Sequence, residues 1–196
     1  MKGIAFFDFD GTITCKDTLW EIIRFQKGAT AMYAGIIKLL PDLVLFKLKK
    51  IPAQDMKQRV LEYFFGEMKE QQFADACRNF CHNRLPQLIR KPALTAIQNH
   101  QSSGHQVVVV TASAYHWVAP WCQSLGIACI ATLLEVKDHR ITGRILGINC
   151  NGHEKVARIM QEYNMEDYGE IYAYGDSEGD APMLALSPQP QFKPFR

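Results

Sequence analysis

The sequence predicts an α/β fold, in which a doubly wound, Rossmann-like parallel sheet carries a helical insertion. After Arg90, short apolar or β-branched runs alternate with helical patterns, as in buried parallel strands connected by helices. Between Asp17 and Arg90 the pattern is helical, with little strand signal. We therefore expect an α/β core formed by residues 1–16 and 91–196, and an all-helical cap domain formed by residues 17–90.

The individual elements follow from apolar periodicity and from glycine and proline positions. Ile4 to Phe7 is an apolar run followed by acids and Gly11, which predicts a buried strand ending in a turn. We expect Gly28 to end the first helix of the insertion, and Pro41 and Pro52 to break the later ones. After the insertion we expect a helix at 92–103, a strand at 106–110, a helix at 115–125, a strand at 127–131, a hairpin at 134–148, a helix at 154–163, a strand at 171–174, a short helix at 181–186 and at most a weak edge strand at 187–196.

Composition excludes several classes of protein. The 22 basic and 20 acidic residues give a net charge of +2, which provides no electrostatic basis for nucleic-acid binding. The six cysteines include no C-x-x-C pair, so we expect reduced thiols in a cytoplasmic protein rather than a zinc site. The first residues lack the long apolar stretch of a signal peptide.

Acidic residues follow the first predicted strand. Asp8 and Asp10 are two positions apart, so in an extended chain both side chains project to the same side. Two adjacent carboxylates repel each other unless a cation lies between them, and oxygen ligands suit Mg²⁺. Gly11 permits a sharp turn and a close approach of backbone N–H groups to a ligand. The alternative is a turn with two solvated acids.

Four later residues are also candidates, and each lies near the end of a predicted strand or the start of a helix. Thr111 follows the second strand and is either an anion-binding hydroxyl or a helix cap. Lys155 begins a helix and, taken alone, is equally well a solvated surface charge. Asp176 and Asp180 lie in a glycine-bearing loop after the last long strand. Of these two acids, only Asp180 has a structural alternative, which is to cap the next helix.

Carboxyl ends of parallel strands meet at one edge of the sheet, where ligands bind. These groups therefore predict one site, in which Mg²⁺ offsets the acids and Thr111 and Lys155 hold an anion. Phosphate is the natural anion, because an aspartate is able to attack phosphorus as a nucleophile.

The complete set of motifs resembles the haloacid dehalogenase (HAD) superfamily of phosphohydrolases. Asp8-Phe-Asp-Gly-Thr12 matches its first motif, residues 107–111 the second, Lys155 the third, and Gly175-Asp176 through Asp180 the fourth. The insertion after the first motif resembles the C1-type cap of subfamily IB, the phosphoserine-phosphatase-like branch. The resemblance covers residues 4–186.

The resemblance implies a mechanism and a set of site residues. Asp8 would be the nucleophile that forms an aspartyl-phosphate, and Asp10 the general acid and base. Mg²⁺ would be held by the Asp8 carboxylate, the Asp10 main-chain carbonyl and Asp176, with Asp180 as a direct or water-mediated ligand. Thr111 and Lys155 would stabilise the transferring phosphoryl group. The expected substrate-binding residues are Gly11, Thr12, Asp17, Arg59, Ala112 and Ser113.

The substrate remains open at this stage. Thr111-Ala112-Ser113 replaces the Ser-Gly-Gly-like second motif of phosphoserine phosphatases, and Asp17 is shorter than the usual cap glutamate. An amino-acid phosphate is therefore one alternative. A non-catalytic phosphate-binding regulatory protein is another, although every expected catalytic position is filled.

The middle of the insertion, residues 33–48, is strongly apolar but too short and too interrupted to span a bilayer. It predicts either a packed cap core or an apolar substrate channel with a peripheral membrane contact through the cap. The phosphatidylglycerophosphate phosphatases of the C type have a similarly apolar cap and the Gly-His-Glu-Lys-Val-Ala pattern of residues 152–157. Hence the expected substrate is a small-molecule or lipid phosphate monoester.

Overall fold

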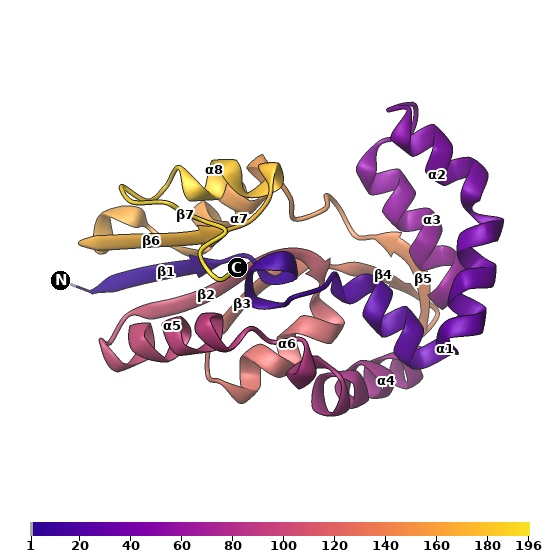
Figure 1. Ribbon diagram of the computed structural model, residues 1–196, viewed down its shortest axis with the longest axis horizontal. Coiled ribbons are helices and arrows are strands. Elements are labelled where there is room, and N and C mark those ends of the chain that lie inside the picture. Colours follow the sequence, from indigo (N-terminus) through magenta and orange to yellow (C-terminus); the bar gives the residue numbers. More distant parts are fainter. Residues whose placement is uncertain (1) are drawn as a thin grey trace.

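The computed structural model describes residues 2–196 and contains a central five-stranded parallel sheet (Figure 1). The spatial order is β3-β2-β1-β6-β7. The strands are β1 Gly3–Phe7, β2 Gln106–Ala114, β3 Ala128–Thr132, β6 Glu170–Gly175 and β7 Gln191–Phe192. All four neighbouring pairs are parallel, so the predicted doubly wound sheet is confirmed.

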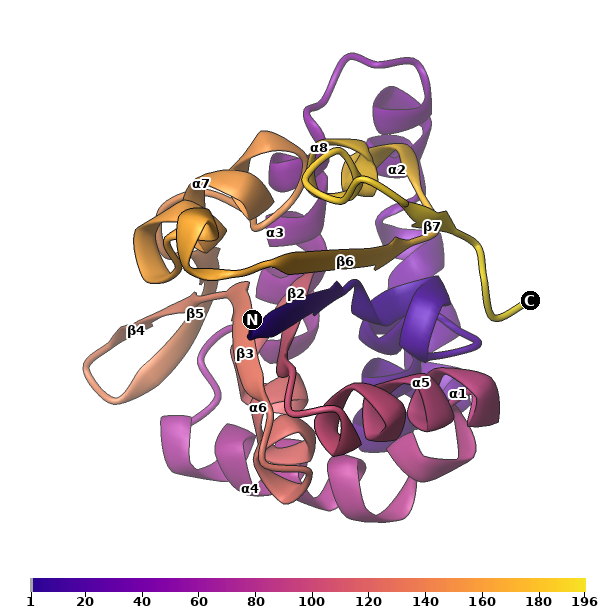
Figure 2. The same ribbon diagram turned by 90° about the vertical axis from the view of Figure 1, so that its left-hand side faces the viewer.

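Helices cover both faces of this sheet (Figure 2). On one face lie α5 Lys91–Ser102 and α6 Tyr115–Ser124, and on the other α7 His153–Glu162 and α8 Ala181–Leu184. Alternate residues of β1 pack into different clusters: Ala5 and Phe7 on one side, Ile4 and Phe6 on the other. Burial on both faces explains why β1 is continuously apolar.

Between β1 and α5 the chain forms four α-helices: α1 Thr18–Lys38, α2 Leu40–Lys47, α3 Ala53–Phe65 and α4 Glu70–Asn83. The stop predicted at Gly28 is a break within α1, where a φ of 82° and a ψ of 162° interrupt the helix before it resumes. Pro41 and Pro52 separate the later helices as predicted, because Pro41 lies in the first turn of α2 and Pro52 directly precedes α3.

The two connections between sheet and helices lie side by side. Thr14 and Ile89 form an antiparallel bridge, and the Arg90 N–H donates to the Ile13 carbonyl at 2.8 Å. The domain boundaries at residues 17 and 90 stay a prediction. The helices also share their apolar core with the sheet, since Phe73 and Phe80 of α4 belong to the same buried cluster as Trp117 of α6.

A separate hairpin, β4 Leu134–Lys137 and β5 Arg140–Ile145, packs against α3. Gly143 has a φ of +86°, and a Cβ there would lie 2.4 Å from the Glu62 Cα of α3. Gln58 accepts the Ile145 N–H at 2.9 Å. The hairpin therefore holds α3 by backbone-to-helix contact.

The second strand is longer than predicted. β2 continues to Ala114 instead of ending at Val110, because Ala114 still pairs with Thr132 of β3 after an irregularity in the register. This extension carries Thr111, Ala112 and Ser113 along the edge where β1 and β6 end.

The close contact at Gly143 leads to a stability prediction. Gly143→Ala combines a left-handed φ, which costs an alanine about 1–2 kcal/mol, with overpacking of about 1–3 kcal/mol against α3. The matched control is Gly104→Ala, at a φ of +75° with nothing within 4 Å of the added Cβ. Urea unfolding should show a loss of about 2–5 kcal/mol for Gly143→Ala and only about 1–2 kcal/mol for the control. Equal losses would contradict the close packing of β5 on α3.

Candidate active site

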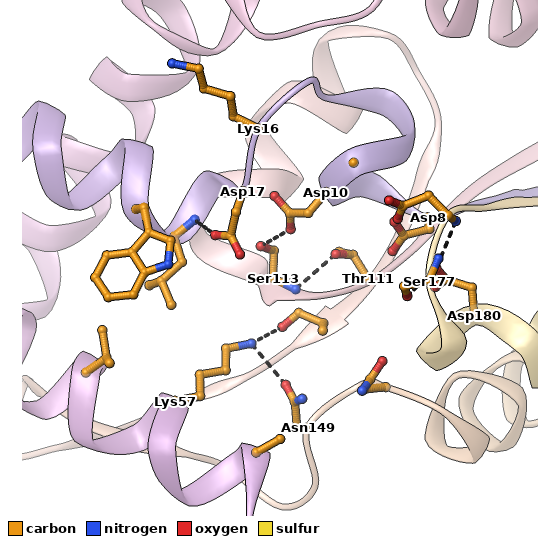
Figure 3. Close-up of a pocket in the computed structure, with 18 of the residues that line it drawn as sticks. Asp8, Asp10, Lys16, Asp17, Lys57, Thr111, Ser113, Asn149, Ser177 and Asp180 are labelled. Atoms are coloured by element: carbon orange, nitrogen blue, oxygen red, sulfur yellow. Dashed lines mark hydrogen bonds between the residues drawn. The ribbon is translucent and has the colours of Figure 1, made fainter. Parts of the chain in front are cut away.

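A cavity of about 1020 Å³ lies at the carboxyl ends of β1, β2 and β6 and is covered by the helices of the insertion (Figure 3). The predicted residues that line it are Asp8, Asp10, Gly11, Asp17, Thr111, Ala112, Ser113, Asp176 and Asp180. Lys155 lies directly behind Asp8, while Thr12 is buried and its hydroxyl has no hydrogen-bond partner. The structure thus brings together residues that are up to 172 positions apart (Asp8 and Asp180).

Lys155 is the buried cation of the site. It is 1% exposed, and its ammonium donates to Asp8 Oδ1 at 2.7 Å, Asp180 Oδ1 at 2.7 Å and the Val110 carbonyl at 2.8 Å. All three hydrogens are therefore used. Burial alone would lower the pKa of Lys155, but Asp8 and Asp180 outweigh it and raise the pKa above the usual range. The alternative of a solvated surface lysine is excluded by this burial.

Asp8 is buried at the end of β1, and its backbone N–H donates to the Tyr174 carbonyl of β6 at 2.9 Å. Burial raises the pKa of Asp8 to about 7, even though Lys155 favours the ionised form. A nucleophilic carboxylate must be ionised, so further positive charge beside Asp8 would promote its reactivity.

Asp10 belongs to a partly buried hydrogen-bond chain that does not include Lys155. Its Oδ1 accepts the Thr18 N–H at 2.6 Å, and its Oδ2 accepts the Ser113 hydroxyl at 2.5 Å. Ser113 in turn shares a hydrogen bond of 3.0 Å with the Thr18 hydroxyl, which accepts the Trp117 indole N–H at 3.1 Å. Sequence reasoning missed Thr18 and Trp117, although a buried tryptophan generally needs a partner for its N–H.

Three carboxylates can share one cation. Asp8, Asp176 and Asp180 each offer an oxygen, and these oxygens lie within 4.8 Å of one another. Gly11 is packed against this cluster, because a Cβ at its φ of +83° would meet Asp176 Oδ2 at 2.4 Å. A set of hard oxygen donors beside a side-chain-free backbone fits Mg²⁺. Arg196 forms an ion pair with Asp176, so each of the three acids has a positive partner in the protein.

Asp180 does not cap the following helix α8 as the sequence allowed, because its side chain makes no capping hydrogen bond there and instead closes the preceding turn at Glu178–Asp180. Its Oδ2 accepts from the Ser177 N–H at 2.9 Å, the Ser177 hydroxyl at 2.7 Å and the Asp176 N–H at 3.1 Å. Burial would raise the pKa of Asp180, but Lys155 and Ser177 outweigh it and lower the pKa. Asp180 therefore orders the loop that carries Asp176. By contrast, burial raises the pKa of Asp176.

The insertion contributes Asp17 and Lys57, which face each other across the cavity (Figure 3). Asp17 caps α1 by accepting the Leu19 N–H at 2.9 Å, and burial, with Asp10 nearby, raises its pKa to about 6. Lys57 of α3 donates to the Ala112 carbonyl and, at 3.0 Å, to Asn149 Oδ1. Burial lowers the pKa of Lys57 to about 8, against the attraction of Asp10 and Asp17.

The prediction for Arg59 requires correction. Arg59 is exposed and forms an ion pair with Asp42 of α2, and it does not line the cavity. Lys57, two positions earlier on the same helix, points inward instead. No sequence signal distinguished Lys57 from an ordinary surface lysine.

The outer part of the cavity is apolar. Its lining includes Trp20 of α1, Leu43 and Phe46 of α2, and Met56 and Val60 of α3. The cavity therefore combines a charged floor with an apolar roof, an arrangement suited to an anionic group attached to an apolar one.

Comparison with known proteins follows this geometry. The model of the haloacid dehalogenase-like hydrolase family (HAD) matches residues 5–185. The chain belongs to this family. Protein CicA of Caulobacter vibrioides is 31% identical over 97% of this chain and 85% of its own length. A histidinol-phosphatase of Neisseria meningitidis is 26% identical over 97% of this chain and 89% of its own.

Solved structures share the fold. A Bordetella pertussis protein of unknown function superimposes with a TM-score of 0.81 at 22% identity, over 94% of this chain and 86% of its own. A phosphoserine phosphatase without ligand gives a TM-score of 0.67 at 19% identity, over 95% of this chain and 84% of its own. The protein is thus a hydrolase of the HAD family, and its relatives support a phosphatase activity.

The position of Lys57 leads to a pH prediction. Lys57 is charged below about pH 8 and neutral above it, so any contact with a substrate anion should weaken as the pH rises through this value. We expect Lys57→Met to lower kcat/KM about 10- to 100-fold, the range for a charged hydrogen bond, and Lys57→Arg to retain low KM at high pH. Steady-state kinetics on the best substrate of a phosphate-ester panel measures this. Superimposable KM profiles for wild type and Lys57→Arg would contradict the assignment.

Proposed function

We propose that the protein is a magnesium-dependent phosphomonoester hydrolase that acts through an aspartyl-phosphate on Asp8. The observation that carries this proposal is a buried Asp8 held by Lys155 within reach of Asp176 and Asp180. A bound Mg²⁺ would be held by Asp8 and Asp176, with the Asp10 main-chain carbonyl and with Asp180 directly or through water, and would supply positive charge to the phosphoryl oxygens. The close grouping of Asp8, Asp176 and Asp180 supports this proposed donor set.

The protein's own residues divide the remaining work. Lys155 occupies one oxygen of Asp8, so the other oxygen attacks phosphorus while the ester bond breaks. Asp10, held by Thr18 and Ser113, gives its proton to the leaving alcohol oxygen. Asp10 then takes a proton from water, whose oxygen attacks the phosphorus of the aspartyl-phosphate and releases phosphate. Thr111 and Lys155 would stabilise the charge that develops on the phosphoryl group.

The cavity favours a small-molecule or lipid phosphate whose alcohol part is apolar, because the apolar side chains of Leu43, Phe46 and Met56 line the cavity and would contact that alcohol part. The proposal includes a membrane contact through the insertion, since Leu43 and Phe46 belong to a helix with an exposed apolar face. A cytoplasmic location is supported by six free thiols, four of them buried.

A second candidate substrate is an amino-acid or amino-alcohol phosphate. Asp17 and Lys57 place opposite charges on two sides of the cavity, suited to an amine and a carboxylate. The similarity to a histidinol-phosphatase, whose substrate also carries an amine, favours this candidate. A screen with Mg²⁺ over sugar, amino-acid, nucleotide and lysophospholipid phosphates separates the two candidates. The absence of turnover in the whole screen would favour the non-catalytic phosphate-binding alternative.

The nucleophile is tested by Asp8→Asn. The amide is isosteric but poorly nucleophilic, so we expect activity to fall by at least about 10³-fold, the scale lost on removing a catalytic group. Asp8→Asn also breaks the charge pair with Lys155, so a thermal melt must establish that the variant is folded. In the wild type, beryllium fluoride should bind Asp8 as a phosphoryl mimic, detectable by ¹⁹F NMR and lost in Asp8→Asn. A folded variant with substantial activity would rule out Asp8 as nucleophile.

The metal is tested by chelation and by two substitutions. A chelator should abolish turnover and added Mg²⁺ should restore it. Asp176→Ala should weaken Mg²⁺ binding about 10- to 100-fold, as measured by calorimetry. Asp180→Ala should weaken Mg²⁺ binding less but should destabilise the protein more, because it removes three loop hydrogen bonds and one partner of Lys155. Full activity in chelator would exclude the metal mechanism.

A further inference from the structure

The end of the insertion exposes an unusual amount of apolar surface. Tyr33 and Ile37 of α1 are 59% and 71% exposed, and Leu48 after α2 is 60% exposed. Within residues 2–196, α2 contains no buried residue although six of its eight residues are apolar. A helix that is apolar on all sides is normally covered. We call this surface the apolar tip and define it by Tyr33, Ile37, Leu40, Val44, Leu45 and Leu48.

Lysines surround the apolar tip. Lys38, Lys47, Lys49 and Lys50 are all exposed. Among residues 2–196, lysine ion pairs occur at Lys16 and Lys155 and not at these four. Asp42 is the one acid among residues 33–50, and it already forms an ion pair with Arg59. The apolar tip therefore carries uncompensated positive charge next to exposed apolar side chains.

The apolar tip is also continuous with the candidate active site. On α2, Leu43 and Phe46 line the cavity, and Leu40, Val44, Leu45 and also Phe46 are exposed. A helix with its side chains is about 10–12 Å across, so any surface that covers the outer side of α2 lies within that distance of the cavity roof. In Figure 1, α2 lies at the end of the molecule opposite the N-terminus and away from the sheet.

We propose that the apolar tip docks on the surface of an anionic lipid bilayer. Inserted apolar side chains beside lysines are the combination that binds peripheral helices to anionic membranes. A second copy of this chain is a poorer occupant, because a two-fold contact would bring the lysines of both copies together. A membrane-spanning segment is disfavoured too, because among the described residues no single helix is long and apolar enough to cross a bilayer. Only α1 and α2 taken together have the necessary length and apolar composition, and these two helices meet at a bend of 60°.

Docking has a consequence for the substrate, which rests on the proposed phosphatase function. With the roof of the cavity at the lipid surface, a phosphate monoester with a lipid tail is able to reach Asp8 by passing Leu43 and Phe46 without crossing water. A soluble ester needs no such contact.

Vesicle binding tests the docking independently of catalysis. Flotation is measured in chelator, with vesicles of phosphatidylcholine alone and of phosphatidylcholine mixed with phosphatidylglycerol. We expect binding to the mixed vesicles that high salt weakens, and much less binding to phosphatidylcholine alone. Ile37→Glu should weaken binding about 5- to 30-fold, and the pair Lys47→Gln/Lys50→Gln about 30-fold on mixed vesicles only. Lys91→Gln, an exposed lysine at the start of α5, is the matched control and should have no effect.

The outcomes separate the two proposals. Neither lysine nor Ile37 lines the cavity, so turnover of a soluble ester such as p-nitrophenyl phosphate should stay unchanged in these variants, while turnover of lysophosphatidate in mixed vesicles falls with binding. If the wild type, Ile37→Glu and Lys47→Gln/Lys50→Gln all bind the mixed vesicles equally, the docking proposal is overturned. A dimer in sedimentation that Ile37→Glu dissociates also overturns it, in favour of a second copy. Loss of p-nitrophenyl phosphate turnover in Asp8→Asn with vesicle binding intact supports both proposals, whereas docking without any turnover in the wild type overturns only the proposed function.

Discussion

The site depends on one buried ammonium group. Lys155 lies between Asp8 and Asp180, and each oxygen–nitrogen distance is 2.7 Å. Removing one member of a buried ion pair leaves an uncompensated charge and costs about 3–5 kcal/mol, so neither acid is stable in place without the lysine. The lysine itself is positioned by the first turn of α7 and by the Val110 carbonyl of β2. The ammonium nitrogen of Lys155 thereby connects α7 with β2, with the end of β1 and with the loop after β6.

This convergence explains a division of labour among the acids. One oxygen of Asp180 accepts a hydrogen bond from Lys155 and the other accepts from the Ser177 N–H, so Asp180 holds the lysine and the loop in place and has no free oxygen to react. Asp10 accepts hydrogen bonds from Ser113 and Thr18, in a network that does not include Lys155. Two carboxylates only two residues apart are thus placed in separate hydrogen-bond networks, which is what a nucleophile and a proton donor require.

The insertion supplies Lys57 and the apolar part of the cavity lining. α3 is clamped by the hairpin at Gly143, which fixes Lys57 against Ala112 and Asn149. In α2, by contrast, no residue is buried. α3 therefore supplies both the charged Lys57 and the apolar Met56 and Val60 to the cavity, whereas α2 supplies only the apolar Leu43 and Phe46.

The sequence alone determined the parallel sheet and the acids at its edge. Buried strands are read from continuous apolar runs, and parallel strands must end at a common edge, so Asp8, Thr111 and Asp176 were predictable as neighbours. The tertiary structure alone decided that Lys57 and not Arg59 faces the cavity, because two successive steps of about 100° put these residues on nearly opposite sides of α3. It also decided which apolar residues of 33–48 are covered: Leu39 is buried in the core and Ile36 and Leu43 pack against it, while most of the others are exposed. Apolar composition is the same in either case, and only the position of neighbouring elements determines which apolar faces are covered.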